Sequence, residues 1–203
     1  MSHESMHFPA TSMPDRDWWS ALWPDPEAVL RSTGVSEGDK VIDLCSGDGL
    51  FTAPMGHIVG EAGDVQAVEL LPEMIAAARR EVASAGAPSV RFIQGDAMKL
   101  SELVEAPVDC VFMANTFHGV PDHTGLSRAV HEVLRPGGRF IIVNWWPRAR
   151  EETPVLGKPR GPREAMRYSP EQLSEWLAPA GLGLVEVVEV GPFHYGAVFE
   201  RVR

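Results

Sequence analysis

Cysteine is scarce in this sequence, with only Cys45 and Cys110 among 203 residues. Two cysteines without C-x-x-C spacing do not make a zinc motif, so we expect no metal site. We interpret both as reduced thiols that are buried at the ends of core strands. Reduced thiols are typical of a cytoplasmic protein, and we expect that location.

Long apolar runs and an excess of positive charge are also missing. No run approaches the roughly 18 residues that span a bilayer, so we expect no membrane span. The first residues lack the basic and apolar parts of a signal peptide. The net charge of −10 argues against a general nucleic-acid binder. The hydrophobic content of 44% favours one globular domain, and an oligomer remains an option.

A glycine turn organises the chain between Val41 and Thr52. An apolar run predicts a strand, Gly47 and Gly49 predict a tight turn, and apolar residues at helical spacing follow. A strand that leads through a glycine turn into a helix is the nucleotide-binding corner of an open α/β sheet. Asp43 and Asp48 would repel a pyrophosphate. They suit a positively charged ligand such as S-adenosylmethionine, which has a sulphonium and an ammonium.

Polar residues end the next three predicted strands as well. Glu69 closes the second strand, twenty residues after Gly49, where nucleotide folds place an acid that holds ribose hydroxyls. Asp96 lies in a Gly-Asp-Ala loop after the third strand. Asn115 ends the fourth, which reads as a fully buried parallel strand. Because parallel strands end at one edge of a sheet, we expect these residues close together.

The remainder predicts two more helices, a fifth strand and a terminal hairpin. A Leu-Arg-Pro-Gly-Gly sequence turns the chain after a helix. Ser169 and Pro170 begin the last helix as cap and first residue. The predicted elements are a helix over 122–134, a strand over 140–145, a helix over 169–180, and hairpin strands over 184–190 and 195–202.

In this order, the motifs resemble those of the class I S-adenosylmethionine-dependent methyltransferases from about residue 36 to residue 203. Cys45 stands where the D-x-G-x-G-x-G pattern of that family has its first glycine. The resemblance implies a Rossmann-like α/β fold. Its seven-stranded, mostly parallel sheet carries helices on both faces and a C-terminal antiparallel hairpin strand. The motifs are close to those of the family's small-molecule branch, which includes quinone-biosynthesis-type enzymes.

The resemblance also implies the cofactor, S-adenosylmethionine, and the residues that bind it. Leu70 or Met74 would pack against adenine, while Asp96 and Ala97 would recognise its amine and a ring nitrogen. The expected cofactor-binding residues are Asp43, Cys45, Ser46, Gly47, Gly49, Glu69, Leu70, Met74, Asp96, Ala97 and Asn115.

His118 follows the fourth strand, where the resembled fold places the reacting methyl group. As a histidine with a pKa near neutrality, it is a candidate to orient or deprotonate the acceptor. The alternative is a structural role, with the imidazole bonded to the loop backbone.

Two segments are candidates for the acceptor side. Three tryptophans lie within residues 17–23, and the helices over 17–33 either pack on the sheet edge or form a lid, with Trp19 toward substrate. The loop over 147–168 is locally basic. It is either a solvated loop or one whose Arg160 and Arg163 hold an anionic substrate.

We therefore expect a methyltransferase that acts on a small-molecule acceptor. The alternative is a protein that binds S-adenosylmethionine or S-adenosylhomocysteine without turnover. The acidic turn and the terminal hairpin argue against a nicotinamide dehydrogenase. Residues 1–16 are expected to form a flexible tail, in which His3 and His7 are weak candidates for metal ligands.

Overall fold

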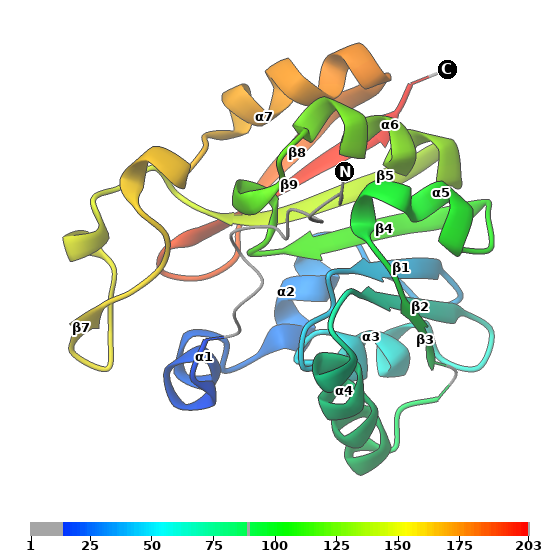
Figure 1. Cartoon of the computed structure of the whole chain (residues 1–203), viewed down its shortest axis with the longest axis horizontal. Coiled ribbons are helices and arrows are strands. Elements are labelled where there is room, and N and C mark those ends of the chain that lie inside the picture. The colour runs from blue at the N-terminus through cyan, green and yellow to red at the C-terminus, as the bar shows by residue number, and fades with distance from the viewer. Residues whose placement is uncertain (1–13, 89, 203) are drawn as a thin grey trace, which may run out of the picture.

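A seven-stranded sheet forms the centre of the computed structural model, which describes residues 14–88 and 90–202 (Figure 1). The spatial order is β3-β2-β1-β4-β5-β9-β8. All neighbouring strands are parallel except β9, which pairs antiparallel with β5 and β8. The strands are β1 (Lys40–Leu44), β2 (Asp64–Glu69), β3 (Val90–Gln94), β4 (Val108–Ala114), β5 (Leu134–Trp145), β8 (Leu182–Glu189) and β9 (His194–Arg201).

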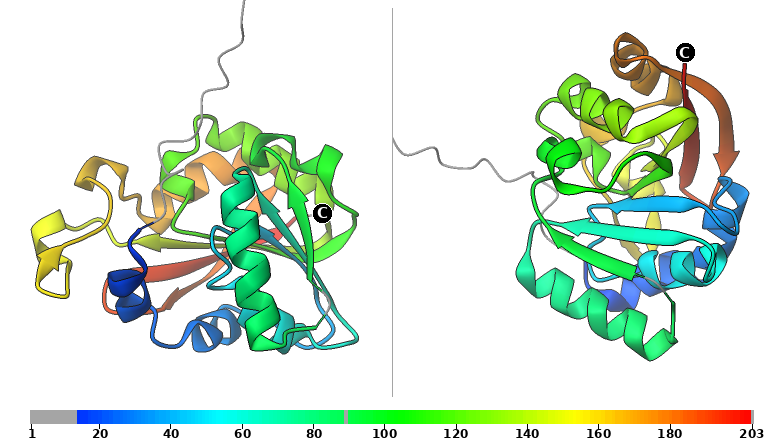
Figure 2. Two further views of the ribbon diagram at one scale, coloured as in Figure 1. Left: turned by 60° about the horizontal axis from the view of Figure 1, so that its bottom comes forward. Right: turned by 90° about the vertical axis from the view of Figure 1, so that its right-hand side faces the viewer.

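Helices cover both faces of the sheet, as the two views of Figure 2 show. The α-helices are α1 (Arg16–Leu22), α2 (Pro26–Ser32), α3 (Thr52–Val59), α4 (Pro72–Ala85), α5 (Leu100–Leu103), α6 (His123–Val133) and α7 (Pro170–Leu177). Short 3-10 turns are η1 (Ala97–Lys99), η2 (Phe117–Gly119), η3 (Arg150–Glu152), η4 (Glu164–Met166) and η5 (Ala178–Ala180). The sequence-based prediction of the fold is confirmed.

Two hydrophobic cores hold the layers together. On one face, side chains of α5, α6 and α7 pack against the sheet around Phe117 and Phe140. On the other face, α1, α2 and α3 pack around Phe112 and Met55. The central strands β1 and β4 alternate their side chains between these cores, so both faces of these strands are apolar, as in a buried parallel sheet.

The connections place a reversal of direction at the centre of the sheet. The chain lays down β1, β2 and β3 outward to one edge, then returns to place β4 on the other side of β1. The loops that follow β1 and β4 therefore diverge. This is the position at which open α/β sheets bind ligands, beyond the carboxyl ends of the strands.

Side-chain caps mark the starts of two helices, and the predicted cap at Ser169 is confirmed. Asp25 caps α2 by accepting a hydrogen bond from the backbone N–H of Ala28, and Pro26 is the first helical residue. Ser169 and Gln172 form a reciprocal capping box at the start of α7. Each satisfies backbone N–H groups that the helix leaves without an internal partner.

Two elements differ from the prediction. The fifth strand begins at Leu134 and not at residue 140, because residues 135–138 bulge out while the ladder with β4 continues on either side. The loop over 147–168 is not simply extended. It contains η3, η4 and a small hairpin of β6 (Pro154–Val155) and β7 (Lys158–Pro159), which local sequence patterns did not indicate.

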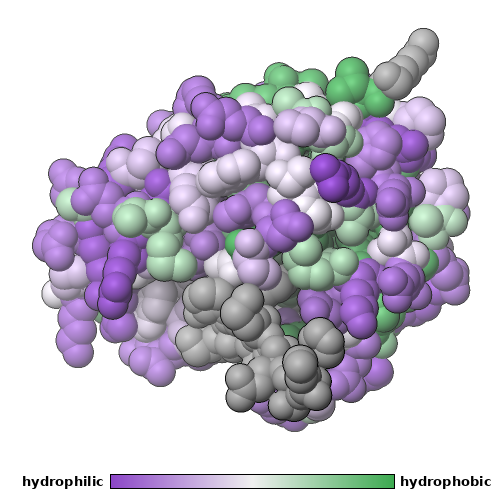
Figure 3. All heavy atoms as spheres, turned by 45° about the horizontal axis from the view of Figure 1, so that its top comes forward, coloured by the Kyte–Doolittle hydropathy of each residue, from purple (hydrophilic) through white to green (hydrophobic). Residues whose placement is uncertain are grey.

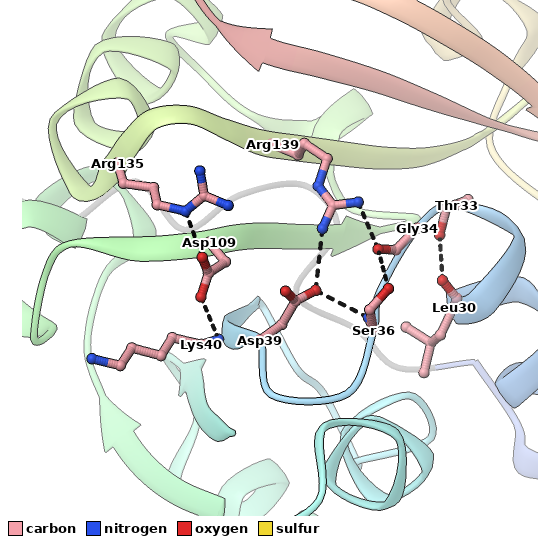
Figure 4. A network of polar contacts seen from close by, with 9 residues as sticks. All are labelled: Leu30, Thr33, Gly34, Ser36, Asp39, Lys40, Asp109, Arg135 and Arg139. Carbon is pink, nitrogen blue, oxygen red and sulfur yellow. Dashed lines mark hydrogen bonds and ion pairs between the residues drawn. The ribbon is translucent and has the colours of Figure 1, made fainter. Parts of the chain in front are cut away.

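A polar network closes the amino-terminal ends of β1 and β4, away from the reversal point (Figure 4). The Arg139 guanidinium donates to the Gly34 carbonyl at 2.6 Å and to the Asp39 carboxylate at 3.1 Å. Arg135 pairs with Asp109, which also accepts from the Lys40 backbone N–H at 2.8 Å. These arginines are thus neutralised by carboxylates and act structurally.

The surface seen in Figure 3 is mostly hydrophilic, with apolar side chains along its upper margin. Among the described residues, the exposed large apolar side chains lie mainly on or after the edge hairpin, at Leu184, Val185, Val187 and Val202. In the part of the chain that the structure covers, no helix is both long and apolar enough to cross a membrane.

Candidate functional site

A cavity of about 490 Å³ lies at the reversal point, which is within the range of about 300–1,000 Å³ typical of small-molecule sites. One wall is formed by the loop after β1, from Cys45 to Asp48, and by Asp43. A second is formed by the residues after β4, from Ala114 to Thr116, and by His118. The third wall comes from α1, Trp145 and the segment 150–166.

The glycine turn depends on backbone conformations that few side chains tolerate. Gly47 and Gly49 have φ of +55° and +89°, and a Cβ on Gly49 would lie 2.9 Å from the Cα of Ala78. Cys45 has a φ of +62°, in the left-handed region that favours glycine. This conformation explains why the resembled pattern has glycine where this chain has cysteine.

Glu69 fixes this turn from the end of β2. Its carboxylate accepts hydrogen bonds from the backbone N–H groups of Gly47 at 3.0 Å, Leu70 at 2.8 Å and Leu71 at 3.0 Å. A carboxylate offers about four acceptor positions, so this one is oriented and retains capacity for a further donor.

Asp43 is the most deeply buried acid of the site, with 3% of its surface exposed. Its carboxylate accepts a hydrogen bond from the hydroxyl of Thr52. Burial raises the pKa of Asp43 to about 7, and the nearby charge of Glu69 adds to the rise. A positively charged ligand would favour the ionised form of this group.

Asn115 is held by a residue from the far end of the chain. Its backbone has a φ of +58°, and its side-chain oxygen lies 2.9 Å from Nε2 of His194. The His194 ring packs between Trp23 and Trp145, with ring centroids at 4.5 and 4.0 Å. Burial holds the pKa of His194 well below its usual value, so the neutral ring donates its Nε2–H to Asn115.

His118 lies in η2 and lines the cavity, as expected. Burial and, to a smaller extent, the positive charge of Arg167 lower the pKa of His118 to about 4. Its buried Nδ1 has no hydrogen-bond partner within the described ranges. The neutral imidazole therefore suits a hydrogen-bonding role toward a ligand better than that of a strong base.

The residues expected on the adenine side lie at the ends of β2 and β3, beside the cavity and not in its lining. The Asp96 carboxylate accepts from the Met98 backbone N–H at 2.9 Å and caps η1. Ala97 is buried in the core. Leu70 directly follows β2 and Met74 lies in the first turn of α4, and both are partly exposed.

The residues expected on the acceptor side do reach the cavity. Trp19, Arg160 and Arg163 line it. Trp18, Trp145 and Arg150 line it too, and the sequence analysis did not select them. The sequence analysis also did not select His194, because that residue lies in the turn between the two predicted hairpin strands. The aromatic clustering of α1 was a usable signal for Trp18, whereas His194 depends on strand pairing.

Comparisons with known proteins find similarity to methyltransferases. A family profile described as "Methyltransferase domain" matches residues 41–138. The chain is 30% identical to the ubiquinone/menaquinone biosynthesis C-methyltransferase UbiE of Haemophilus ducreyi over 118 residues, which are 58% of this chain and 45% of the relative. It is 29% identical to a Staphylococcus aureus demethylmenaquinone methyltransferase over 115 residues, 57% of this chain and 46% of the relative.

The chain thus spans less than half the length of these curated relatives. Its fold also matches a solved structure over nearly the whole chain. A SAM-dependent methyltransferase from Aquifex aeolicus superposes with a TM-score of 0.78 and 28% identity, covering 93% of this chain and 95% of the other. The acidic glycine turn, the order of the strands and these matches agree with one another: in fold and in the sequence of its glycine turn, the chain is similar to the class I S-adenosylmethionine-dependent methyltransferases.

Proposed function

We propose that this protein transfers a methyl group from S-adenosylmethionine to a small-molecule acceptor. Four unsatisfied polar atoms on the cavity walls that follow β1 and β4 support this proposal most directly. Ser46 Oγ, Asp48 Oδ1, Asn115 Nδ2 and His118 Nδ1 are buried without a hydrogen-bond partner in the part of the chain described, and all four residues line the cavity. Each such atom costs about 1–3 kcal/mol, so the cavity fits a polar ligand that restores these bonds.

The residues present fit the cofactor of the family. Asp43 would face the ammonium, and the turn from Cys45 to Gly49 would let the methionine part approach the backbone. Glu69 would hold the ribose hydroxyls with its remaining acceptor capacity. Leu70 or Met74 would pack against adenine, and Asp96 with Ala97 would bind its edge. Asn115 would hold the amino-acid end through its free amide.

When bound, S-adenosylmethionine supplies a methyl group that is already activated by its sulphonium. The protein then has to align the acceptor and exclude water. Trp19 and Trp145 close the cavity with apolar surface. His118 would accept a hydrogen bond from the acceptor through Nδ1 and orient it, and its low pKa makes it a weak proton acceptor.

The acceptor is proposed to be a small molecule, in line with the names of the curated relatives, one of which refers to ubiquinone/menaquinone biosynthesis and the other to demethylmenaquinone. An aromatic wall from α1 and β5 suits such a ring. The net charge of −10 supports a small-molecule partner over nucleic acid. Both cysteines are free thiols, which supports a cytoplasmic location.

The test is calorimetric titration with S-adenosylmethionine, S-adenosylhomocysteine and NAD, side by side. We expect micromolar binding of the first two and none of NAD. An acceptor screen read by release of S-adenosylhomocysteine then separates an enzyme from a protein that only binds the cofactor. Binding of NAD alone would overturn the roles given to Asp43, Glu69 and Asp96.

A further inference from the structure

The segment between β5 and α7 places a cluster of guanidinium groups at the cavity. Arg150, Arg160 and Arg163 line it, and Asp43 and Asp48 line it from β1 and the loop after β1. The cavity therefore has an acidic side, made by the loop after β1, and a basic side, made by this segment. The protein as a whole has a net charge of −10, so the local positive charge runs against its overall composition.

These arginines lack the carboxylate partners that other arginines of the protein have. Arg135 and Arg139 are paired with Asp109 and Asp39 in the network of Figure 4. Within residues 14–88 and 90–202, no arginine of the segment 150–167 forms an ion pair with a carboxylate. Their positive charges are therefore available to a ligand.

The segment is held in place before any ligand binds. Arg167 is only 3% exposed and donates to the Arg160 carbonyl at 2.9 Å, the Thr153 hydroxyl at 3.0 Å and the Pro162 carbonyl at 3.1 Å. Its guanidinium stacks on Trp145 at 4.9 Å. Its Nη1 is buried and has no partner among the described residues. A buried, unpaired cation next to the lining arginines favours an anion in the cavity.

Aromatic side chains lie directly beside the positive groups. The Arg160 guanidinium lies over the Trp18 ring at 4.8 Å from its centroid, and Trp18 packs edge-on against Trp19 at 5.5 Å. Gly161 has a φ of +86°, and a Cβ there would lie 2.8 Å from the Trp145 ring. The chain thus brings the arginines close to a flat apolar surface that suits an aromatic ring.

We propose that the methyl acceptor is an aromatic carboxylate, whose anionic group binds Arg150, Arg160 and Arg163 and whose ring packs against Trp18 and Trp19. Guanidinium groups bind carboxylates through paired hydrogen bonds, which fixes the orientation of the acceptor as well as its affinity. This inference rests on the proposed function, because the acceptor has to bind beside the cofactor. The other carboxylate that these arginines could hold is that of the cofactor itself.

The test uses the full chain saturated with S-adenosylhomocysteine and measures acceptor binding by calorimetry. The probes are benzoate, salicylate and naphthoate, each compared with its neutral primary amide. We expect at least one carboxylate to bind about tenfold or more tightly than its amide, because hydrogen bonds to charged groups are the stronger ones. Arg160→Gln and Arg163→Gln should each remove most of this preference.

Arg148→Gln is the matched control, because Arg148 is an exposed arginine of the same segment that lies outside the cavity lining. It should leave the preference unchanged, and all three variants should bind S-adenosylhomocysteine as the parent does. If every acid bound no more tightly than its amide, or if no acid bound at all, the aromatic-carboxylate inference would be overturned while the proposed function would stand. Weaker cofactor binding in Arg160→Gln and Arg163→Gln would assign the arginines to the cofactor and also overturn it. Failure of the parent to bind S-adenosylhomocysteine would overturn the proposed function itself.

Discussion

Replacement of Asp43 by asparagine should stabilise the free protein and weaken its hold on the cofactor. Burial raises the pKa of Asp43 from 3.8 to about 7 in the folded protein. A rise of about three pH units corresponds to roughly 4 kcal/mol of preference for the neutral form. Because the folded pKa is raised, the folded chain binds an extra proton between these two values. This contribution to stability is complete below the lower value and is lost as pH rises through about 7.

Asparagine is neutral at every pH, so Asp43→Asn should remove this loss. At about pH 8 we expect the free energy of unfolding to rise by about 1–3 kcal/mol, less than the full 4, because the buried amide still needs hydrogen bonds. At about pH 5, where Asp43 is protonated in the fold but largely ionised in the unfolded chain, the gain should fall to less than about half of its value at pH 8. Urea denaturation followed by tryptophan fluorescence at both pH values measures the difference.

Cofactor affinity should change in the opposite direction. The parent should bind S-adenosylmethionine about tenfold more tightly at about pH 8 than at about pH 6, because the ammonium requires the ionised carboxylate. Asp43→Asn should bind weakly at both pH values. A variant that is destabilised equally at both pH values, or that retains tight binding, would refute the reasoning, since Asp43 would then be neither strained by burial nor a ligand of the ammonium.

Three further substitutions test the site. Cys45→Gly should raise the free energy of unfolding by about 0.5–1 kcal/mol in thermal denaturation, because the relief of the positive φ outweighs the extra conformational entropy that glycine gives the unfolded chain. Cys110→Gly is the control: it lies in the middle of β4 and should lower the free energy of unfolding. Glu69→Gln should weaken cofactor binding by about tenfold or more in calorimetry, because the amide loses one of the oxygens that hold the turn and the ribose. His118→Asn should lower kcat less than about a hundredfold, and the pH–rate profile of the parent should show no inflection near pH 6.5 from this group, because the pKa of His118 is about 4.

The sequence was sufficient for the fold because each parallel strand has a local signal. Each predicted strand has its own mark: an apolar run around Asp43, an acid at Glu69 and a buried run before Asn115. Because these marks follow one another in the chain with helices between them, they predict a parallel sheet. The start of β5 was wrong by six residues, since the Pro-Gly-Gly segment looks like a turn but bulges out of a continuing ladder. A bulge is defined by the partner strand, which no local pattern reveals.

Long-range pairing also explains what the sequence left out of the site. His194 reaches Asn115 only because β9 pairs antiparallel with β5 in a register that sets His194 opposite Trp145. A shift by one residue would turn its ring to the other face of the sheet. Likewise, Arg167 lies in a loop that reads as solvated, and its burial depends on Trp145 and Thr153. Such contacts become visible only once the strands are assembled.

The proposed cofactor-binding residues and the proposed acceptor-binding residues lie in different parts of the chain. Every residue proposed to bind the cofactor, from Asp43 to Asn115, falls within the segment 41–138 that matches the family profile. Trp19, Arg160 and Arg163 fall outside it, on α1 and on the segment after β5. A change in those two segments would leave the sheet and the glycine turn in place, because neither contributes a strand to the parallel part of the sheet. The proposed division of roles therefore predicts that substitutions of Arg160 and Arg163 change acceptor binding while cofactor binding is retained.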